Sequence, residues 1–151
     1  MTYVCEIKDQ SAQPTISLRT HAAVGDLPQV LGQTFGAIMQ YLGEQDEQPT
    51  GAPFVAYYNM DMQNLDIEIG FPVARPLPGR GELKGGALPA GKIATTLHIG
   101  PYDTIAPAYD ALTHYTQASG YQPTGVAYEI YFSDPSTPPE KIQTQIVFPL
   151  N

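Results

Sequence analysis

Hydrophobic positions recur with two different spacings along this chain. Residues 15–22 alternate Ile16 and Leu18 with polar neighbours, which is the period-two pattern of a half-buried strand. From Val30 to Leu42 the apolar residues recur instead at the spacing of an amphipathic helix. The first half of the chain is therefore predicted as a strand over 15–22, a helix from about Leu27 to Gly43, and strands over 53–58 and 67–71.

The same order returns after a turn-rich stretch at 75–86. Proline and glycine are concentrated there, as expected of a linker between two halves. A strand is expected over 88–99 and a helix over 103–119, with its start shifted toward Ile105 because Pro107 is tolerated only in a first turn. The second half ends with predicted strands over 126–132 and 142–148, joined by a Pro-rich turn from Pro135 to Pro139.

A repeated tetrapeptide relates the two halves to each other. Gln-Pro-Thr-Gly occurs at 48–51 and again at 122–125, and each copy leads without a gap into an aromatic, strand-like run. When the two runs are aligned, Glu129 falls opposite Val55. The matched order of elements makes a duplication much more probable than a chance match of four residues.

The duplication predicts the fold class. We expect an α+β fold of two β-α-β-β units with pseudo-twofold symmetry, a mostly antiparallel sheet, one helix per unit and a central ligand groove. With 151 residues the chain has room for one shared core, so 1–151 is predicted as a single domain with internal repeats at about 1–75 and 82–151.

Glu129 interrupts a strand that is otherwise apolar and aromatic. Because side chains alternate faces on a strand, Glu129 shares its face with Tyr131, and Val55 and Tyr57 occupy the equivalent face of the first unit. Burial of an unpaired carboxylate is costly, so a buried Glu129 is held by a partner, protonated through a raised pKa, or available to a cation. The alternative is that it faces solvent on one side of a two-sided sheet.

Tyrosine is the other compositional signal, with ten Tyr and no Trp in the chain. Aromatic faces attract organic cations. Tyr102, at the turn between a strand and a helix, is expected to reach the groove. Tyr109 and Tyr115, on the predicted helix, are expected to be core or rim residues instead.

Charge and composition exclude several classes of function. A net charge of −8 with no basic cluster argues against nucleic-acid and anionic-membrane binding. The single Cys5 forms no internal disulfide, and the sequence has no signal peptide or membrane span, so we expect a cytoplasmic protein. The three histidines lack metal-ligand spacing, and no nucleotide-binding motif is present, so no metal or cofactor is expected. Asp66 and Glu68 share a strand face, which is more typical of solvation than of acid and base catalysis.

Several motifs, in order along nearly the whole chain, resemble the GyrI-like effector-binding domain. This is the ligand module that also follows DNA-binding domains in AraC-type and MerR-type multidrug-responsive regulators. The motifs are Leu-Pro-Ala-Gly-Lys at 88–92, His-Ile-Gly-Pro-Tyr-Asp at 98–103, Tyr-Glu-Ile-Tyr at 128–131, Val-Phe-Pro-Leu at 147–150, and in the first half 53–57 and 66–73.

The resemblance implies a groove in which an acidic residue, matched by Glu129, meets lipophilic cations among aromatic side chains. By the same implication Tyr57, Tyr102 and Tyr131 become candidate ligand contacts. A helix-turn-helix domain does not fit within 151 residues, so the resemblance is to a stand-alone member. It would bind amphipathic organic compounds, for sensing alongside a separately encoded regulator or for sequestration.

Two alternatives follow from the same family. Some stand-alone members are thought to hydrolyse reactive cyclopropyl compounds, in which case Glu129 would act as general base toward a water molecule. Others inhibit a protein target such as gyrase, and the negative charge of this chain is compatible with a basic partner surface. We expect binding rather than catalysis.

Overall fold

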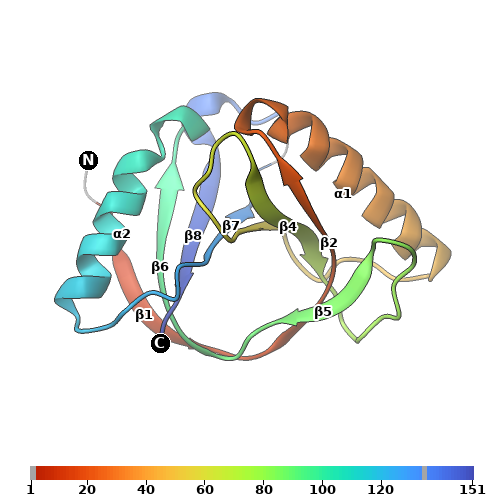
Figure 1. Cartoon of the computed structure of the whole chain (residues 1–151), viewed down its shortest axis with the longest axis horizontal. Coiled ribbons are helices and arrows are strands. Elements are labelled where there is room, and N and C mark those ends of the chain that lie inside the picture. The colour runs from red at the N-terminus through yellow and green to blue at the C-terminus, as the bar shows by residue number, and fades with distance from the viewer. Residues whose placement is uncertain (1–2, 134–135) are drawn as a thin grey trace. The chain divides into compact units, whose positions relative to one another are not determined.

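The computed structural model of the chain describes residues 3–133 and 136–151. The chain divides into two compact units, one formed by Ser11–Ala90 and the other by Met1–Gln10 together with Gly91–Asn151. Each unit combines an antiparallel sheet with an α-helix (Figure 1). The N-terminal strand therefore belongs to the unit that is otherwise made by the second half of the sequence.

The Ser11–Ala90 unit has its strands in the order β3-β4-β2-β5, all antiparallel to their neighbours. Its helix α1 is entered through a short 3₁₀ turn, Val24–Asp26, and has Pro28 in its first turn, where the missing N–H is not needed. The elements are β2 (Gln13–Ala22), α1 (Leu27–Glu44), β3 (Phe54–Tyr57), β4 (Leu65–Pro72) and β5 (Lys84–Leu88).

One face of this sheet packs against α1. Ile16 lies opposite Phe71 across the β2–β4 ladder, and both join Ile38 and Leu42 of the helix in one buried cluster. Tyr41 is also buried there, and its hydroxyl accepts a hydrogen bond of 3.0 Å from the backbone N–H of Gly79. The helical spacing seen in the sequence thus corresponds to the face that α1 buries.

The second unit repeats this plan with the strand order β1-β6-β8-β7. Its helix α2 carries Pro107 in the first turn, as the sequence required. The elements are β1 (Cys5–Gln10), β6 (Gly91–Ile99), a 3₁₀ turn (Tyr102–Thr104), α2 (Ala106–Ala118), β7 (Ala127–Tyr131), a 3₁₀ turn (Pro139–Lys141) and β8 (Gln143–Pro149).

Smaller residues make the core between this sheet and α2. Ala108 and Leu112 of the helix pack against Ala94, Ile146 and Phe148. Ala94 and Phe148 are opposite each other in the β6–β8 ladder, so they share the face that α2 covers. This face also carries Glu129, which is opposite Ile146 in the β7–β8 ladder.

The predicted α+β fold class is confirmed, with each unit containing a β-α-β-β sequence of elements. Two strands were missed. β1 was not expected at all, and β5 lies partly in the stretch interpreted as a linker. The Pro-rich turn expected at 135–139 begins at Pro135, which lies outside the described residues. Single-domain organisation and a groove shared by the units stay predictions.

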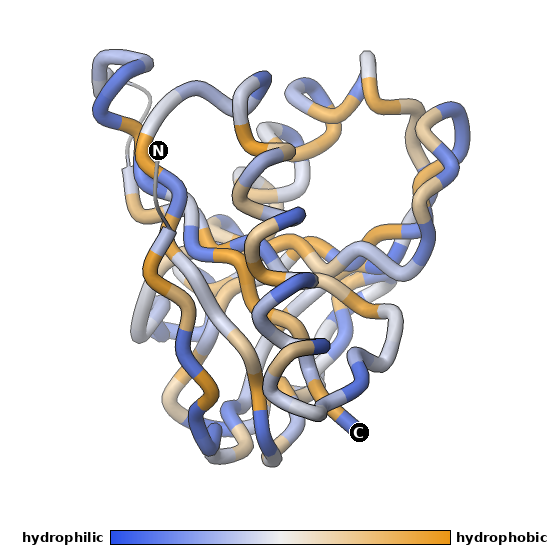
Figure 2. Tube along the Cα trace, turned by 90° about the vertical axis from the view of Figure 1, so that its left-hand side faces the viewer, coloured by the Kyte–Doolittle hydropathy of each residue, from blue (hydrophilic) through white to orange (hydrophobic). Residues whose placement is uncertain are grey.

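Hydrophobic and hydrophilic residues alternate over short distances along the chain, as the colours of Figure 2 show, and this holds for the helices as well as the strands. Neither α1 nor α2 nor any shorter helix in the described part of the chain is long and apolar enough to span a bilayer.

Alanine substitution at two glycines, Gly70 and Gly36, should change the stability of the protein in opposite directions. A Cβ at Gly70 of β4 would lie 2.6 Å from the Ile16 carbonyl oxygen and 2.9 Å from the Phe54 ring, so Gly70→Ala should destabilise the protein by about 2 kcal/mol. Gly36 is exposed within α1 and has no atom within 4 Å of its Cβ position, so Gly36→Ala should stabilise by roughly 0.5–1 kcal/mol. Urea unfolding of both variants measures the difference, and equal midpoints would contradict this packing.

Candidate functional site

Glu129 lies in the middle of β7, on the sheet face that α2 covers. Its exposed fraction is only 9%, so the solvent-facing alternative is excluded. Both carboxylate oxygens accept hydrogen bonds from tyrosine hydroxyls. Tyr131, two residues along the same strand, donates to Oε1 at 2.9 Å, and Tyr109 of α2 donates a short hydrogen bond to Oε2. The sheet and the helix therefore each supply one donor.

Burial dominates the electrostatics of this carboxyl group. Desolvation raises the pKa of Glu129 above its ordinary value, while the hydrogen bonds from Tyr109 and Tyr131 and the proximity of His98 act in the opposite direction. Within residues 3–133 and 136–151, no ion pair with Lys, Arg or His involves Glu129. The site thus has hydrogen-bond donors for an anion but no permanent positive charge.

Tyr102 lies at the solvent side of this group. Its ring packs edge to face against Tyr131, with centroids 5.8 Å apart, and 49% of the residue is exposed. Partial burial, and secondarily the nearby Glu129, raise the pKa of the Tyr102 phenol. The buried Thr144 hydroxyl lies close enough to lower that pKa slightly, although it makes no hydrogen bond of standard geometry among the described residues.

The structure brings together three of the five predicted site residues. Glu129, Tyr131 and Tyr102 form one cluster in the second unit. Val55 and Tyr57 lie on β3 in the Ser11–Ala90 unit, where Val55 is fully buried and Tyr57 is half-buried. A contribution of Tyr57 or Val55 to a common ligand site stays a prediction.

Tyr109 was missed as a site residue, because the helix on which it lies was expected to place it in the core or at the rim. It does pack in the core, with its ring 6.0 Å from that of Phe148, but its hydroxyl reaches Glu129. Only part of the signal was present in the sequence. Tyr109 is three residues before the buried Leu112, so the helical period places it near the face that α2 buries, and a buried tyrosine hydroxyl needs a partner. Which group that partner is does not follow from the period.

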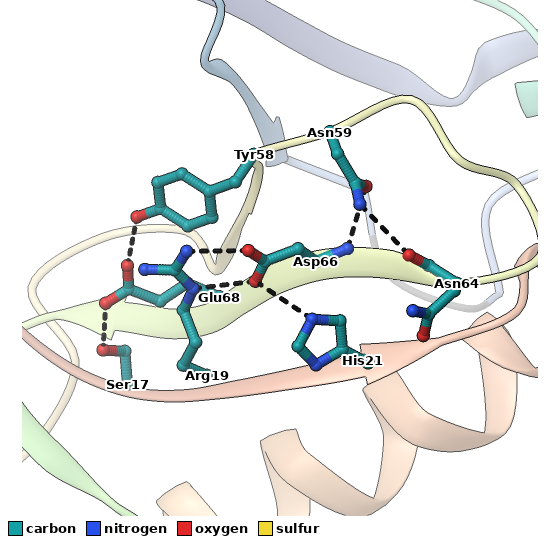
Figure 3. A network of polar contacts seen from close by, with 8 residues as sticks. All are labelled: Ser17, Arg19, His21, Tyr58, Asn59, Asn64, Asp66 and Glu68. Carbon is teal, nitrogen blue, oxygen red and sulfur yellow. Dashed lines mark hydrogen bonds and ion pairs between the residues drawn. The ribbon is translucent and has the colours of Figure 1, made fainter.

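Asp66 and Glu68 of the other unit belong to a polar network on the sheet face opposite α1 (Figure 3). Arg19 makes two hydrogen bonds of 2.8 Å to Asp66, which lower the pKa of that carboxyl, and its guanidinium lies 3.8 Å from the centre of the Tyr58 ring. Glu68 accepts 2.5 Å hydrogen bonds from the Ser17 and Tyr58 hydroxyls. These groups satisfy one another, as a structural network does.

Among the residues that the structure describes, no three His, Cys, Asp or Glu side chains are placed to hold an ion. The Glu129 cluster itself consists of a buried carboxyl group and the phenols of Tyr102, Tyr109 and Tyr131.

Replacement of Glu129 by Gln tests whether the carboxylate is kept at the expense of stability. A carboxyl group with a raised pKa in the folded state stabilises the fold below its unfolded pKa, and this contribution is lost as pH rises through the folded pKa. Glu129→Gln should therefore be at least as stable as the wild type at pH 8, with the difference disappearing toward pH 4. Each unit of pKa shift corresponds to about 1.4 kcal/mol. Thermal unfolding across this pH range measures it, and a variant less stable than the wild type at pH 8 would oppose the assignment.

Known structures share this fold. In a cryo-EM structure of an EcmrR–DNA complex, the matched chain is 22% identical, with a TM-score of 0.85 over 99% of this chain and 57% of that one. The isolated EcmrR C-terminal domain is 21% identical, with a TM-score of 0.80 over 100% of this chain and 99% of that one. The present chain thus spans little more than half of the EcmrR chain in the complex.

Two further structures have the same fold at lower identity. A hydrolase from Listeria innocua is 12% identical, with a TM-score of 0.71 over 97% of this chain and 91% of that chain. SAV2435, solved bound to tetraphenylphosphonium, is 12% identical, with a TM-score of 0.64 over 100% of this chain and 94% of that chain. A comparison with curated protein sequences found no significant match.

The family assignment rests on a match over nearly the whole chain and not on any single motif. The model of the GyrI-like small molecule binding domain matches residues 4–151, which include both units, Glu129 and all three tyrosines of its cluster. The chain belongs to the GyrI-like small molecule binding domain family.

Proposed function

We propose that this protein binds amphipathic organic cations, with Glu129 as the group that complements their charge. The observation that carries the proposal is a carboxyl group with 9% exposure, held by two phenol hydroxyls and lacking an ion pair among the described residues. Membership in a small-molecule binding family and the tetraphenylphosphonium complex of SAV2435 support it. Binding would serve ligand sensing or sequestration.

The tyrosines determine which cations fit. Phenol rings attract a desolvated cation by roughly 0.5–2 kcal/mol each, and Tyr102, Tyr109 and Tyr131 all surround the carboxyl group. The site is buried, so a strongly hydrated ammonium ion would lose more hydration energy on entry than a large cation with delocalised charge. The cluster therefore favours lipophilic cations.

The hydroxyl donors remain compatible with such a ligand. A phosphonium or quaternary ammonium ion has no N–H or O–H to donate, so it does not compete for the carboxylate oxygens that Tyr109 and Tyr131 occupy. It interacts with the carboxylate through space, at a low local dielectric that strengthens the attraction. The half-exposed Tyr102 marks the side from which the ligand approaches.

Tetraphenylphosphonium binding should depend on the charge of Glu129. Because Glu129→Gln removes the charge and keeps the shape, the affinity should fall by at least about tenfold, corresponding to about 1.4 kcal/mol. Glu68→Gln is the matched control, since Glu68 also accepts hydrogen bonds from two hydroxyls but lies in the other unit, away from the α1 face. Titration calorimetry on both variants provides the measurement. Equal affinity of wild type and Glu129→Gln would rule out the proposed role.

Binding should also strengthen as pH rises. Because burial raises the pKa of Glu129, this carboxyl group is protonated at higher pH than a free one, and a cation binds its ionised form better. Affinity for tetraphenylphosphonium should therefore decrease as pH falls through this pKa. Neutral triphenylphosphine oxide is the control ligand, and its affinity should not follow that change. A parallel pH dependence for both ligands would show that Glu129 is not the cause.

A hydrolytic function is the second candidate, favoured by one observation. Glu129 has a raised pKa and lies next to the Tyr131 hydroxyl, so a base and a proton donor are adjacent. The Listeria innocua structure with this fold is described as a hydrolase. Incubation with an activated cyclopropyl compound separates the candidates: turnover that Glu129→Gln abolishes supports hydrolysis, and stoichiometric binding without product supports capture.

A further inference from the structure

His98 is the most deeply buried titratable side chain beside the Glu129 cluster. It lies on β6 with 2% exposure, and both of its ring nitrogens have partners. The Tyr3 hydroxyl is 3.0 Å from Nδ1, and the Pro101 carbonyl oxygen is 3.0 Å from Nε2. Because a carbonyl only accepts, Nε2 is the donor in the bond to Pro101.

The bond to Pro101 acts on the backbone just before Tyr102. The Pro101 carbonyl belongs to the peptide group that joins these two residues, and it also accepts from the hydroxyl and the N–H of Thr104, at 2.9 and 3.2 Å. Gly100 has a φ of +140°, and a Cβ there would lie 3.6 Å from Nε2 of His98. The turn is therefore folded closely over the imidazole ring.

This turn sets the position of the Tyr102 ring. Tyr102 begins the 3₁₀ turn that Pro101 precedes, and its ring packs against Tyr131, the donor to Glu129. His98 of β6 and Tyr131 of β7 are both opposite Thr144 of β8, so the imidazole and the Tyr131 ring lie at the same level on the same sheet face. No hydrogen bond joins His98 to Glu129 among the described residues. His98 acts on that carboxyl group only electrostatically, whereas it is hydrogen-bonded to the backbone that leads into Tyr102.

We propose that His98 is a positioning residue that fixes Tyr102 at the entrance to the Glu129 site, through the Pro101 carbonyl. It sets the affinity for aromatic cations without contacting them. This inference rests on the proposed binding function. Positioning of Tyr102 requires the Nε2 bond to Pro101 and not the Nδ1 bond to Tyr3, so loss of these two bonds should have different effects on binding.

Substitution of His98 by Gln or by Asn distinguishes the hydrogen bond at Nε2 from the one at Nδ1. The Gln side chain places its amide near the position of Nε2, and the Asn side chain places it near Nδ1. His98→Gln should therefore keep the bond to Pro101, and His98→Asn should lose it. Tetraphenylphosphonium affinity should fall by about threefold to tenfold in His98→Asn, the range of one aromatic contact, and by much less in His98→Gln. Tyr3→Phe, which removes only the Nδ1 partner, should leave affinity within about twofold.

A double-mutant cycle distinguishes positioning from general destabilisation. In a Tyr102→Ala background, His98→Asn should have no further effect on affinity, because the side chain that it positions is absent. An equal loss in both backgrounds would overturn the proposal. If His98→Asn does not fold, Thr104→Val removes another donor to the same carbonyl at an exposed residue and should weaken binding in the same direction. Unchanged affinity in Thr104→Val would then count against it.

A readout without ligand keeps the two proposals separate. Fluorine NMR of protein containing 3-fluorotyrosine reports the Tyr102 environment, with the resonance assigned by Tyr102→Phe. In His98→Asn this resonance should move toward that of a solvent-exposed tyrosine, and in His98→Gln it should stay. A wild type that binds no cation, with this NMR pattern intact, refutes the proposed function but not the positioning. A wild type that binds, with an unmoved resonance in His98→Asn, refutes the positioning.

Discussion

A buried carboxyl group held by hydroxyls from two different elements is the constraint on which the site depends. Glu129 lies on β7 and obtains one donor from its own strand and another from α2. A buried carboxyl without such donors would lose its solvation and gain nothing in exchange. The packing of α2 on the sheet is therefore also the condition for keeping Glu129 buried, so the same helix contributes to the site and to the core of this unit.

The core around Glu129 contains several small residues, which make room for the aromatic rings beside it. Ala94, Ala108 and Ala127 contribute little volume, which leaves room for the rings of Tyr109 and Phe148 beside the carboxyl group. The Ser11–Ala90 unit, which has Val55 at the position equivalent to Glu129, buries larger apolar side chains against its helix. They are Ile16, Ile38, Tyr41, Leu42, Phe71, Val73, Leu77 and Leu83.

Elements with a strong hydrophobic period could be predicted from the sequence, and those without one could not. β2, β4, α1 and α2 each bury one face and show it in their spacing. β5 reads Lys-Gly-Gly-Ala-Leu and is almost entirely exposed, so it has no alternation. The first of its two glycines is required by a close backbone contact, because a Cβ at Gly85 would lie 2.0 Å from the Leu77 carbonyl oxygen. β1 is recognisable only through its pairing with β6, which is more than 80 residues away in the sequence.

The candidate site residues likewise divide into those that a sequence pattern could predict and those that depend on how the elements pack. The repeat alone identified Glu129, since an acid replaced an apolar residue at a matched position, and the strand period correctly placed Tyr131 on its face. Tyr109 required knowledge of where α2 lies on the sheet, which neither the period nor the repeat supplies. His98 is hydrogen-bonded to the Pro101 carbonyl, which directly precedes Tyr102, and this contact also could not be read from the sequence. A histidine that lacks metal-ligand spacing can therefore still shape a binding site, through a carbonyl group that no sequence motif records.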